Sequence, residues 1–383
     1  MAVNGRPDTI RTIVLSHDIS SNALGRALSM ALVAQELGEV QVCAFGSGRL
    51  WPGASQFDLD VNRIGRHWKR EIDAVMSASA DTTLVWVCKG ISPLARVVTY
   101  LKDRYPGNIV IADFDDDDAG LAHEFFKSTV LNRIRLLRNR SMLPWVIRRS
   151  QRKIIDLADG FTFASNSVAA AFPSNRGPSA RIPHVRLDST GIAPTNLVNS
   201  IVKPGVSGSI KFGVYGTLRA HKGGSLVLEA IRSHPELHLF TFENCGLEDR
   251  LVTDVNWTEI SPSTPLDKAY AEIDVAVIAI TSLHQSAQMQ FPAKLVDAMR
   301  AGVAIVATGT SAVREYAMSS FLELPSDASV DDLVNLVKAA YKSGLGREAR
   351  LIYESELTPV SAGKNLQRLF DESRDSVLSS VKG

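Results

Sequence analysis

The segment IKFGVYGTLRAHKGG, residues 210–224, decides the fold of its half of the chain. Residues 210–215 are mostly apolar and too few for a helix, which is typical of a strand buried on both faces of a parallel sheet. Gly216 follows, and a glycine at the carboxyl end of a strand lets a ligand approach the backbone closely. Arg219 and Lys222 then stand in one loop, from which both cations could reach a pyrophosphate. A solvated basic loop has the same composition, so the spacing alone leaves both interpretations open.

Short apolar runs of this kind recur along the whole chain, with helical stretches between them. We predict strands in the first half at residues 10–15, 40–45, 83–88, 108–113 and 160–164. In the second half we predict strands at residues 210–215, 237–242, 273–280 and 303–308. Strands that alternate with helices imply right-handed crossovers, so the fold class is α/β with two doubly wound, Rossmann-like parallel sheets.

The length of 383 residues suits two α/β domains better than one hydrophobic core. A stretch rich in Pro and Gly separates the two sets of strands. We predict an N-terminal domain over residues 1–195, a linker over 196–208 and a C-terminal domain over 209–360. A terminal helix over residues 361–383 is expected to pack back toward the first domain. Doubly wound sheets bind ligands at the carboxyl ends of their strands, so both domains should face one cleft.

Composition narrows the classes of function. Apolar residues make up 45% and charged residues 22%, as in an ordinary globular protein, and a net charge of +1 predicts no general attraction to nucleic acid. The three cysteines have no zinc or redox spacing and fit a reducing compartment. The first residues do not resemble a signal peptide, and no apolar run reaches about 18 residues. We therefore expect a cytoplasmic protein.

A second candidate anion site lies in MQFPAKLVDAMRAG, residues 289–302. Pro292 suits the first position of a helix, and Gly302 suits the residue just past its end. The free amide groups and the positive dipole end at the start of this helix suit a diphosphate. Asp297, about one and a half turns in, could accept hydrogen bonds from ribose hydroxyls, or be an ordinary surface residue.

Rossmann-like sheets also occur in dinucleotide-dependent dehydrogenases, but the loop after the first predicted strand argues against that class. Residues 16–25, SHDISSNALG, form a long polar loop and not the G-x-G-x-x-G turn that binds dinucleotides.

The motifs of the second half resemble the donor domain of glycosyltransferase family 4, a group with the two-domain GT-B fold. That family shows a glycine at a strand end, then Arg and Lys-Gly, then Glu-x7-Glu-Ala-Met and a later Glu. The matching residues here are Gly216, Arg219, Lys222, Gly223, Phe291, Pro292, Asp297, Ala298, Met299, Gly302 and Glu315.

The resemblance implies a retaining glycosyltransferase that uses a nucleotide-diphosphate sugar and needs no metal ion or other cofactor. Arg219 and Lys222 would hold the donor diphosphate, and Asp297 would stand in for the Glu that holds ribose. The family's first Glu corresponds to Met289, so Gln288, Gln290 or Lys294 would have to replace its contact with the sugar. The residues implied at the donor site are Gly25, Gly216, Thr217, Arg219, Lys222, Gln290, Phe291, Pro292, Ala293, Lys294 and Asp297.

A run of four aspartates, residues 115–118, follows the strand expected at 108–113. Relatives often carry a sugar-contacting His-Asp pair here, so Asp116 joins Arg219 and Lys222 as a candidate catalytic residue. The aspartates could hold sugar or acceptor hydroxyls, hold a metal ion, or form a solvated acidic loop.

Nine lysines and arginines lie between residues 127 and 153 without an Asp or Glu, and apolar side chains are interleaved with them. Basic, aromatic and helical character together favour contact with an anionic membrane or a phosphorylated acceptor. Arg148, Arg149 and Arg152 are the candidates for this role. A core-packed helix with snorkelling arginines is the alternative.

Retention is expected by front-face attack, in which the departing diphosphate accepts the acceptor's proton and electrostatic preorganisation replaces a protein base. The acceptor would be a hydroxyl compound: a glycan, a lipid-linked glycan or a small molecule. Two alternatives stay open, a non-catalytic nucleotide-sugar or glycan-binding relative, suggested by Met289, and a nucleotide-sugar epimerase.

Overall fold

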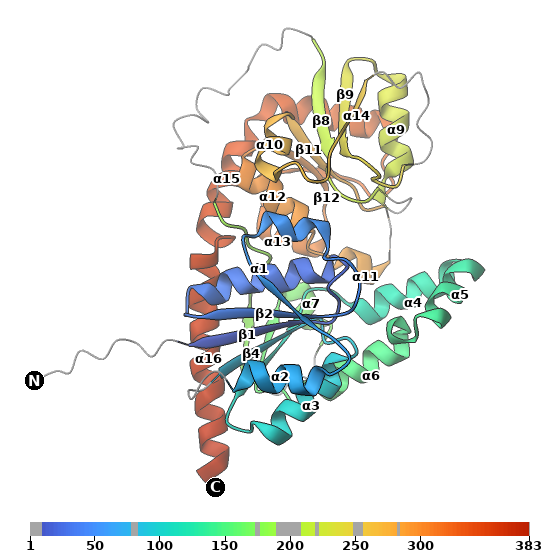
Figure 1. Ribbon diagram of the computed structural model, residues 1–383. Coiled ribbons are helices and arrows are strands. Elements are labelled where there is room, and N and C mark those ends of the chain that lie inside the picture. The colour runs from blue at the N-terminus through green and yellow to red at the C-terminus, as the bar shows by residue number, and fades with distance from the viewer. Residues whose placement is uncertain are drawn as a thin grey trace, which may run out of the picture. The chain divides into compact units, whose positions relative to one another are not determined.

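The computed structural model describes residues 10–77, 83–172, 177–188, 208–218, 222–247, 256–281 and 284–382 (Figure 1). The chain divides into two compact units. The first unit comprises Met1–Val185 and Pro359–Gly383, and the second unit comprises Arg186–Thr358. No helix among the described residues is both long enough and apolar enough to cross a bilayer.

The first unit contains a parallel sheet in the order β3-β2-β1-β4-β5-β6-β7. Every residue of the three central strands is buried, which explains why their sequences are mostly apolar. The register places Leu15 between Cys43 and Val87. The strands are β1 (Arg11–Ser16), β2 (Val40–Phe45), β3 (Val61–Ile64), β4 (Thr83–Cys88), β5 (Ile109–Phe114), β6 (Gly160–Phe163) and β7 (Ser179–Arg181).

Helices cover both faces of this sheet, as right-handed crossovers require. The helix α1 is buried along nearly its whole length, and the last helix, α16, packs against it through Leu366 and Phe370. The close approach depends on Gly363, where an added Cβ would lie 2.8 Å from Cβ of Glu36. The helices are α1 (Ala23–Gln35), α2 (Trp68–Met76), α3 (Leu94–Arg104), α4 (Asp118–Ser128), α5 (Val130–Arg138), α6 (Pro144–Ile155), α7 (Asn166–Ala170) and α16 (Pro359–Lys382), with 3₁₀ turns η1 (Pro52–Gln56) and η2 (Arg140–Met142).

The second unit contains a parallel sheet in the order β10-β9-β8-β11-β12-β13. Its strands are β8 (Ile210–Val214), β9 (Leu237–Phe242), β10 (Trp257–Ile260), β11 (Val275–Ile278), β12 (Ala304–Thr308) and β13 (Leu322–Leu324). Its helices are α9 (Gly224–Ser233), α10 (Leu266–Ala271), α11 (Gln285–Gln288), α12 (Ala293–Ala301), α13 (Ser311–Ala317), α14 (Val330–Ser343) and α15 (Leu345–Glu356).

The predicted α/β class with two doubly wound parallel sheets is confirmed. All nine expected strands form, although the one expected at residues 273–280 is confined to Val275–Ile278. Four strands, β3, β7, β10 and β13, were not expected, and these four are the edges of the two sheets.

The boundary between the units falls at Val185, before the limit of 195 expected from the sequence. The residues just after it belong to the second unit because Arg186 pairs with Asp297 and Asp188 pairs with Arg350. The expected linker, residues 196–208, lies outside the described residues except for Gly208.

Candidate functional site

The carboxyl edge of the second unit's sheet carries the loop that follows β8. Gly216 is exposed and has a φ of +125°, a conformation that other residues rarely adopt. A Cβ added there would meet no atom within 4 Å, so space is open in front of this backbone. The glycine therefore serves the backbone conformation and not the packing of a neighbour.

A second glycine fixes the far end of the same loop. Gly223 has a φ of +71° and is the residue before α9. An added Cβ would lie 2.7 Å from Cβ of Ala279, which follows β11. Only glycine lets Lys222 and its loop lie this close to the end of the neighbouring strand. Arg219, the other predicted cation of the loop, lies outside the described residues.

The segment before α12 is held at both of its ends. The hydroxyl of Thr310 donates a hydrogen bond of 3.0 Å to the carbonyl of Gln290. The centres of the Phe291 and Tyr316 rings lie 4.4 Å apart. Pro292 is the N-cap residue, so the helix begins at Ala293, one residue later than predicted. The predicted end of the helix is confirmed, because Gly302 is the C-cap with a left-handed φ of +67°. The first turn of α12 therefore has a fixed place. The amide of Leu295 donates to the carbonyl of Pro292 at 2.9 Å, and the amides before it precede the first hydrogen bond of the helix.

Lys294 lies in this first turn and is affected by the charge of Lys222. Burial, followed by the charge of Lys222, lowers the pKa of the Lys294 ammonium to about 7, although part of the side chain is exposed. Two ammonium groups beside the positive end of a helix repel one another, and a bound anion would relieve that repulsion. Lys222, Lys294 and the start of α12 thus form a cationic site, which we call the anion cradle.

Asp297 is buried one turn further along α12 and pairs with Arg186. The Arg186 Nε–Asp297 Oδ1 distance is 2.7 Å and the Nη2–Oδ2 distance is 3.4 Å, with both residues less than a tenth exposed. The sequence carried no signal for this contact, because the two residues are far apart in the chain. A role for Asp297 in binding ribose stays a prediction, and Arg186 is the partner that the structure shows.

We expect Asp297→Ala to weaken the binding of ribose nucleotides by about tenfold to a hundredfold, the effect of losing one charged hydrogen bond. Inorganic pyrophosphate, which has no ribose, should bind almost unchanged. Calorimetry with UDP and with pyrophosphate measures both. Equal losses for the two ligands would show that Asp297 acts only through its pair with Arg186.

The first unit carries a different polar cluster at the carboxyl edge of its sheet. Lys89 follows β4 with a φ of +70°, and its ammonium lies among three carboxylates that follow β5. The distances from Lys89 Nζ are 2.6 Å to Asp115 Oδ1, 3.5 Å to Asp116 Oδ2 and 3.2 Å to Asp118 Oδ1. Paired strands β4 and β5 bring these groups together, and we call the set the Lys89 cluster.

The charges of the Lys89 cluster are strongly coupled. Burial disfavours the ionised carboxyl of Asp115, but Lys89 and then Arg26 outweigh it and hold the pKa of this group below its usual range. Burial raises the pKa of Asp116 and of Asp118, in each case with help from the neighbouring carboxylates. The cluster can therefore retain a proton near neutral pH.

Two histidines border the Lys89 cluster. His17 follows β1, and burial together with the charge of Lys89 lowers its pKa to about 4, so the ring is neutral. His184 Nε2 lies 3.8 Å from Asp115 Oδ2. No group of three or more His, Cys, Asp or Glu side chains in the described part of the chain is arranged to ligate a metal ion. Sequence reasoning named Asp116 but missed Lys89 and both histidines, although Lys89 stands directly after a predicted strand.

A fully buried ion pair supports the cluster from within the sheet. Arg26 of α1 donates to both carboxylate oxygens of Asp113, at 2.9 and 2.6 Å, and to the carbonyl of Ile182. The hydroxyl of Thr162 donates to the same carboxylate and accepts from the indole of Trp86. Gly25, predicted near the donor, precedes Arg26 in α1, and a Cβ there would lie 3.0 Å from the ring of Trp51.

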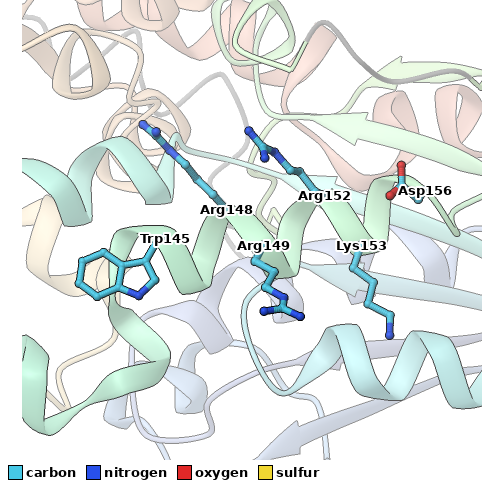
Figure 2. Close-up of a pocket in the computed structure, with 6 residues that line it drawn as sticks. All are labelled: Trp145, Arg148, Arg149, Arg152, Lys153 and Asp156. Atoms are coloured by element: carbon cyan, nitrogen blue, oxygen red, sulfur yellow. The ribbon is translucent and has the colours of Figure 1, made fainter.

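The basic stretch begins at the end of α4 and continues through α5, η2 and α6. On α6, Ile147 and Ile154 are fully buried, so a packed helix with exposed arginines describes this part. Figure 2 shows Arg148 and Arg152 pointing to one side of α6, and Arg149 and Lys153 to the other. An open hollow of about 490 Å³ is lined by Trp145, Arg148, Arg149, Arg152, Lys153 and Asp156.

No protein-family model and no curated protein sequence matches this chain. Solved structures do. HepE of Anabaena in complex with UDP and glucose has a TM-score of 0.64 at 13% identity, covering 94% of this chain and 99% of HepE. Sucrose-phosphate synthase of Thermosynechococcus elongatus has a TM-score of 0.61 at 14% identity, covering 94% and 98%. A glycosyltransferase of Rickettsia africae has a TM-score of 0.60 at 12% identity, covering 96% and 99%.

At these identities the likeness shows the fold, and it extends over nearly the full length of both chains in each comparison. The chain has the GT-B fold that these glycosyltransferase structures share.

Proposed function

We propose that the protein is a glycosyltransferase that takes its sugar from a nucleotide-diphosphate donor. The observation that carries the proposal is the anion cradle, where the charge of Lys222 acts on Lys294 in the first turn of α12. Its cations and amide groups suit a diphosphate. The shared fold with HepE, solved with UDP-glucose, supports a nucleotide sugar as the ligand.

The acceptor would be held by the first unit. The carboxylates of the Lys89 cluster are acceptors of hydrogen bonds, as sugar and alcohol hydroxyls require. Asp116 is the most exposed of the three, with a fifth of its side chain accessible, so it is the carboxylate for a ligand to reach. A glycan, a lipid-linked glycan and a small molecule all offer such hydroxyls.

We infer that transfer retains the anomeric configuration. The bond between the anomeric carbon and the diphosphate oxygen breaks, the acceptor oxygen bonds to the same face of that carbon, and its proton passes to the departing oxygen. Lys222 and Lys294, with Arg219, would offset the charge that grows on the diphosphate. No metal ion or organic cofactor has a part in this scheme.

Donor binding should therefore survive the removal of divalent cations. We expect calorimetry with UDP to give nearly the same affinity with and without excess chelator, because ammonium and amide groups neutralise the phosphates. A collapse of binding in chelator would overturn the metal-free proposal and point to the aspartates of residues 115–118 as metal ligands.

Turnover of a panel of nucleotide sugars, with and without an acceptor extract, tests the function itself. A transferred sugar with the donor's anomeric configuration, read by NMR, is the expected result. Isomerised donor without acceptor would indicate an epimerase. Tight binding without any turnover would indicate a non-catalytic relative, the alternative that Met289 favours.

A further inference from the structure

One face of α5 exposes large apolar side chains to solvent. Val130 is 69%, Leu131 70%, Ile134 43% and Leu137 50% exposed. Val130, Ile134 and Leu137 follow one another at intervals of four and three residues, which places them on one face of the helix. Leu136, on another face of α5, is buried. The apolar face is thus a separate feature from the core.

Arginines flank this apolar face. Arg133, Arg135 and Arg138 are exposed on α5, and no Asp or Glu occurs from Phe125 to Ile155. The whole chain has a net charge of +1, so acidic residues outnumber basic ones in the remainder. The positive charge of the molecule is therefore concentrated around α5 and α6.

Aromatic contacts join α5 to the start of α6. The guanidinium of Arg133 lies over the ring of Phe126 at 5.3 Å from its centre. The ring of Trp145 packs edge-on against the same Phe126 at 5.8 Å, and Trp145 is 54% exposed. The basic hollow of α6 begins at Trp145 and contains four cations with one carboxylate (Figure 2). Apolar residues, an aromatic residue and cations thus form one continuous surface, which we call the α5–α6 surface.

We propose that the α5–α6 surface docks on an anionic phospholipid membrane, with α5 lying in the plane of the interface. The apolar face of α5 would enter the boundary between headgroups and acyl chains, and its arginines would contact the phosphates. Trp145 suits the headgroup level, and the hollow of α6 offers cations to an anionic headgroup. A nucleic acid would account for the arginines but not for four exposed aliphatic side chains, and an acidic protein partner is the outcome that the test separates.

Flotation of the purified full chain with lipid vesicles tests the proposal. We expect binding to vesicles of phosphatidylcholine with phosphatidylglycerol at low salt, and little binding to phosphatidylcholine alone. High salt should weaken the binding without abolishing it. Salt screens the charges of the arginines but does not affect the aliphatic side chains that have entered the membrane. The assay contains no sugar donor, so its result is independent of the proposed transferase activity.

Two triple variants separate the contributions. Val130→Ser, Ile134→Ser and Leu137→Ser remove the apolar face, and Arg133→Ser, Arg135→Ser and Arg138→Ser remove its flanking charge. The arginine set should weaken the partition coefficient by about a hundredfold, since one basic side chain near an anionic membrane contributes about fivefold. The apolar set should weaken it by at least as much, since each methylene buried in the membrane contributes about fourfold. The matched control is Arg66→Ser, Lys69→Ser and Arg70→Ser, which removes three exposed cations around the start of α2 and should leave binding unchanged.

Three results would overturn the proposal. The first is no binding to anionic vesicles at low salt. The second is an apolar variant that binds as well as the wild type, which would leave only a surface attraction. The third is self-association of the wild type, seen by sedimentation velocity and lost in the apolar variant, which would make the α5–α6 surface a contact between copies. Circular dichroism of each variant shows that the fold is retained.

Discussion

Replacing Lys222 and Lys294 together by Met will weaken the binding of UDP by about two to four orders of magnitude. Each ammonium would supply a charge-assisted hydrogen bond worth roughly 1.5–3 kcal/mol, and both belong to the anion cradle of the second unit. Calorimetry measures the loss. Lys268→Met is the matched control, because Lys268 is an exposed lysine of the same unit on α10 and lies outside the cradle. Unchanged affinity in the double variant would show that the diphosphate does not bind at this site.

The same site gives the binding a dependence on pH. The pKa of Lys294, about 7 without a ligand, rises when an anion binds. At a pH where the amine of Lys294 is neutral before binding, the binding of UDP is therefore coupled to the uptake of a proton. Affinity for UDP is therefore full below pH 7 and falls as the pH rises above it, up to the pKa of the bound state. Lys294→Met should remove this slope and leave thermal stability equal or higher, since it relieves the repulsion with Lys222. A slope that persists in Lys294→Met would assign the titration to another group.

Arg26→Met is expected to lower the free energy of unfolding of the first unit by about 3–5 kcal/mol. The substitution leaves the carboxylate of Asp113 fully buried without its cation, and an uncompensated buried charge is among the most destabilising changes known. Urea unfolding followed by tryptophan fluorescence measures it, since the first unit contains Trp51, Trp68, Trp86 and Trp145.

The double variant Arg26→Met with Asp113→Leu is the control for this pair. Apolar replacement of both charges should recover a large part of the stability, because the cost in the single variant arises from the orphaned carboxylate. The recovery will be incomplete, because Thr162 loses the acceptor of its hydroxyl. A double variant that is as unstable as Arg26→Met would mean that the packing of the arginine, and not its charge, stabilises the unit.

The parts of the fold that the sequence predicted are those with two buried faces. A central strand such as β4, with every residue buried, has an apolar run that nothing else explains. The edge strand β3 has the sequence VNRI, with Asn62 and Arg63 exposed, and β7 and β13 have only three residues each. Edge strands are defined by their pairing with a neighbour, which no local pattern records.

The same distinction applies to the candidate site residues. Gly216, Lys222 and Pro292 were identifiable because each stands at a strand end or a helix start that the local sequence marks. Arg186 and Lys89 act through partners that only the tertiary structure supplies, Asp297 in one case and the aspartates after β5 in the other. The carboxyl ends of parallel strands lie at one edge of a sheet, and Lys89 and Asp115 each follow a predicted strand. This could have indicated that the two residues lie close together.

The helix α16 makes the first unit discontinuous in sequence, since Pro359–Gly383 belongs with Met1–Val185. In topological terms the second unit is an insertion in the first. During synthesis from the amino end, the second unit is complete in sequence before the first, whose last core residues, Leu366, Leu369 and Phe370, are translated after it. Until then the face of α1 that α16 covers is exposed, so the nascent first unit presents an apolar surface of the kind that chaperones bind. The sequence of the first unit begins first and is completed last.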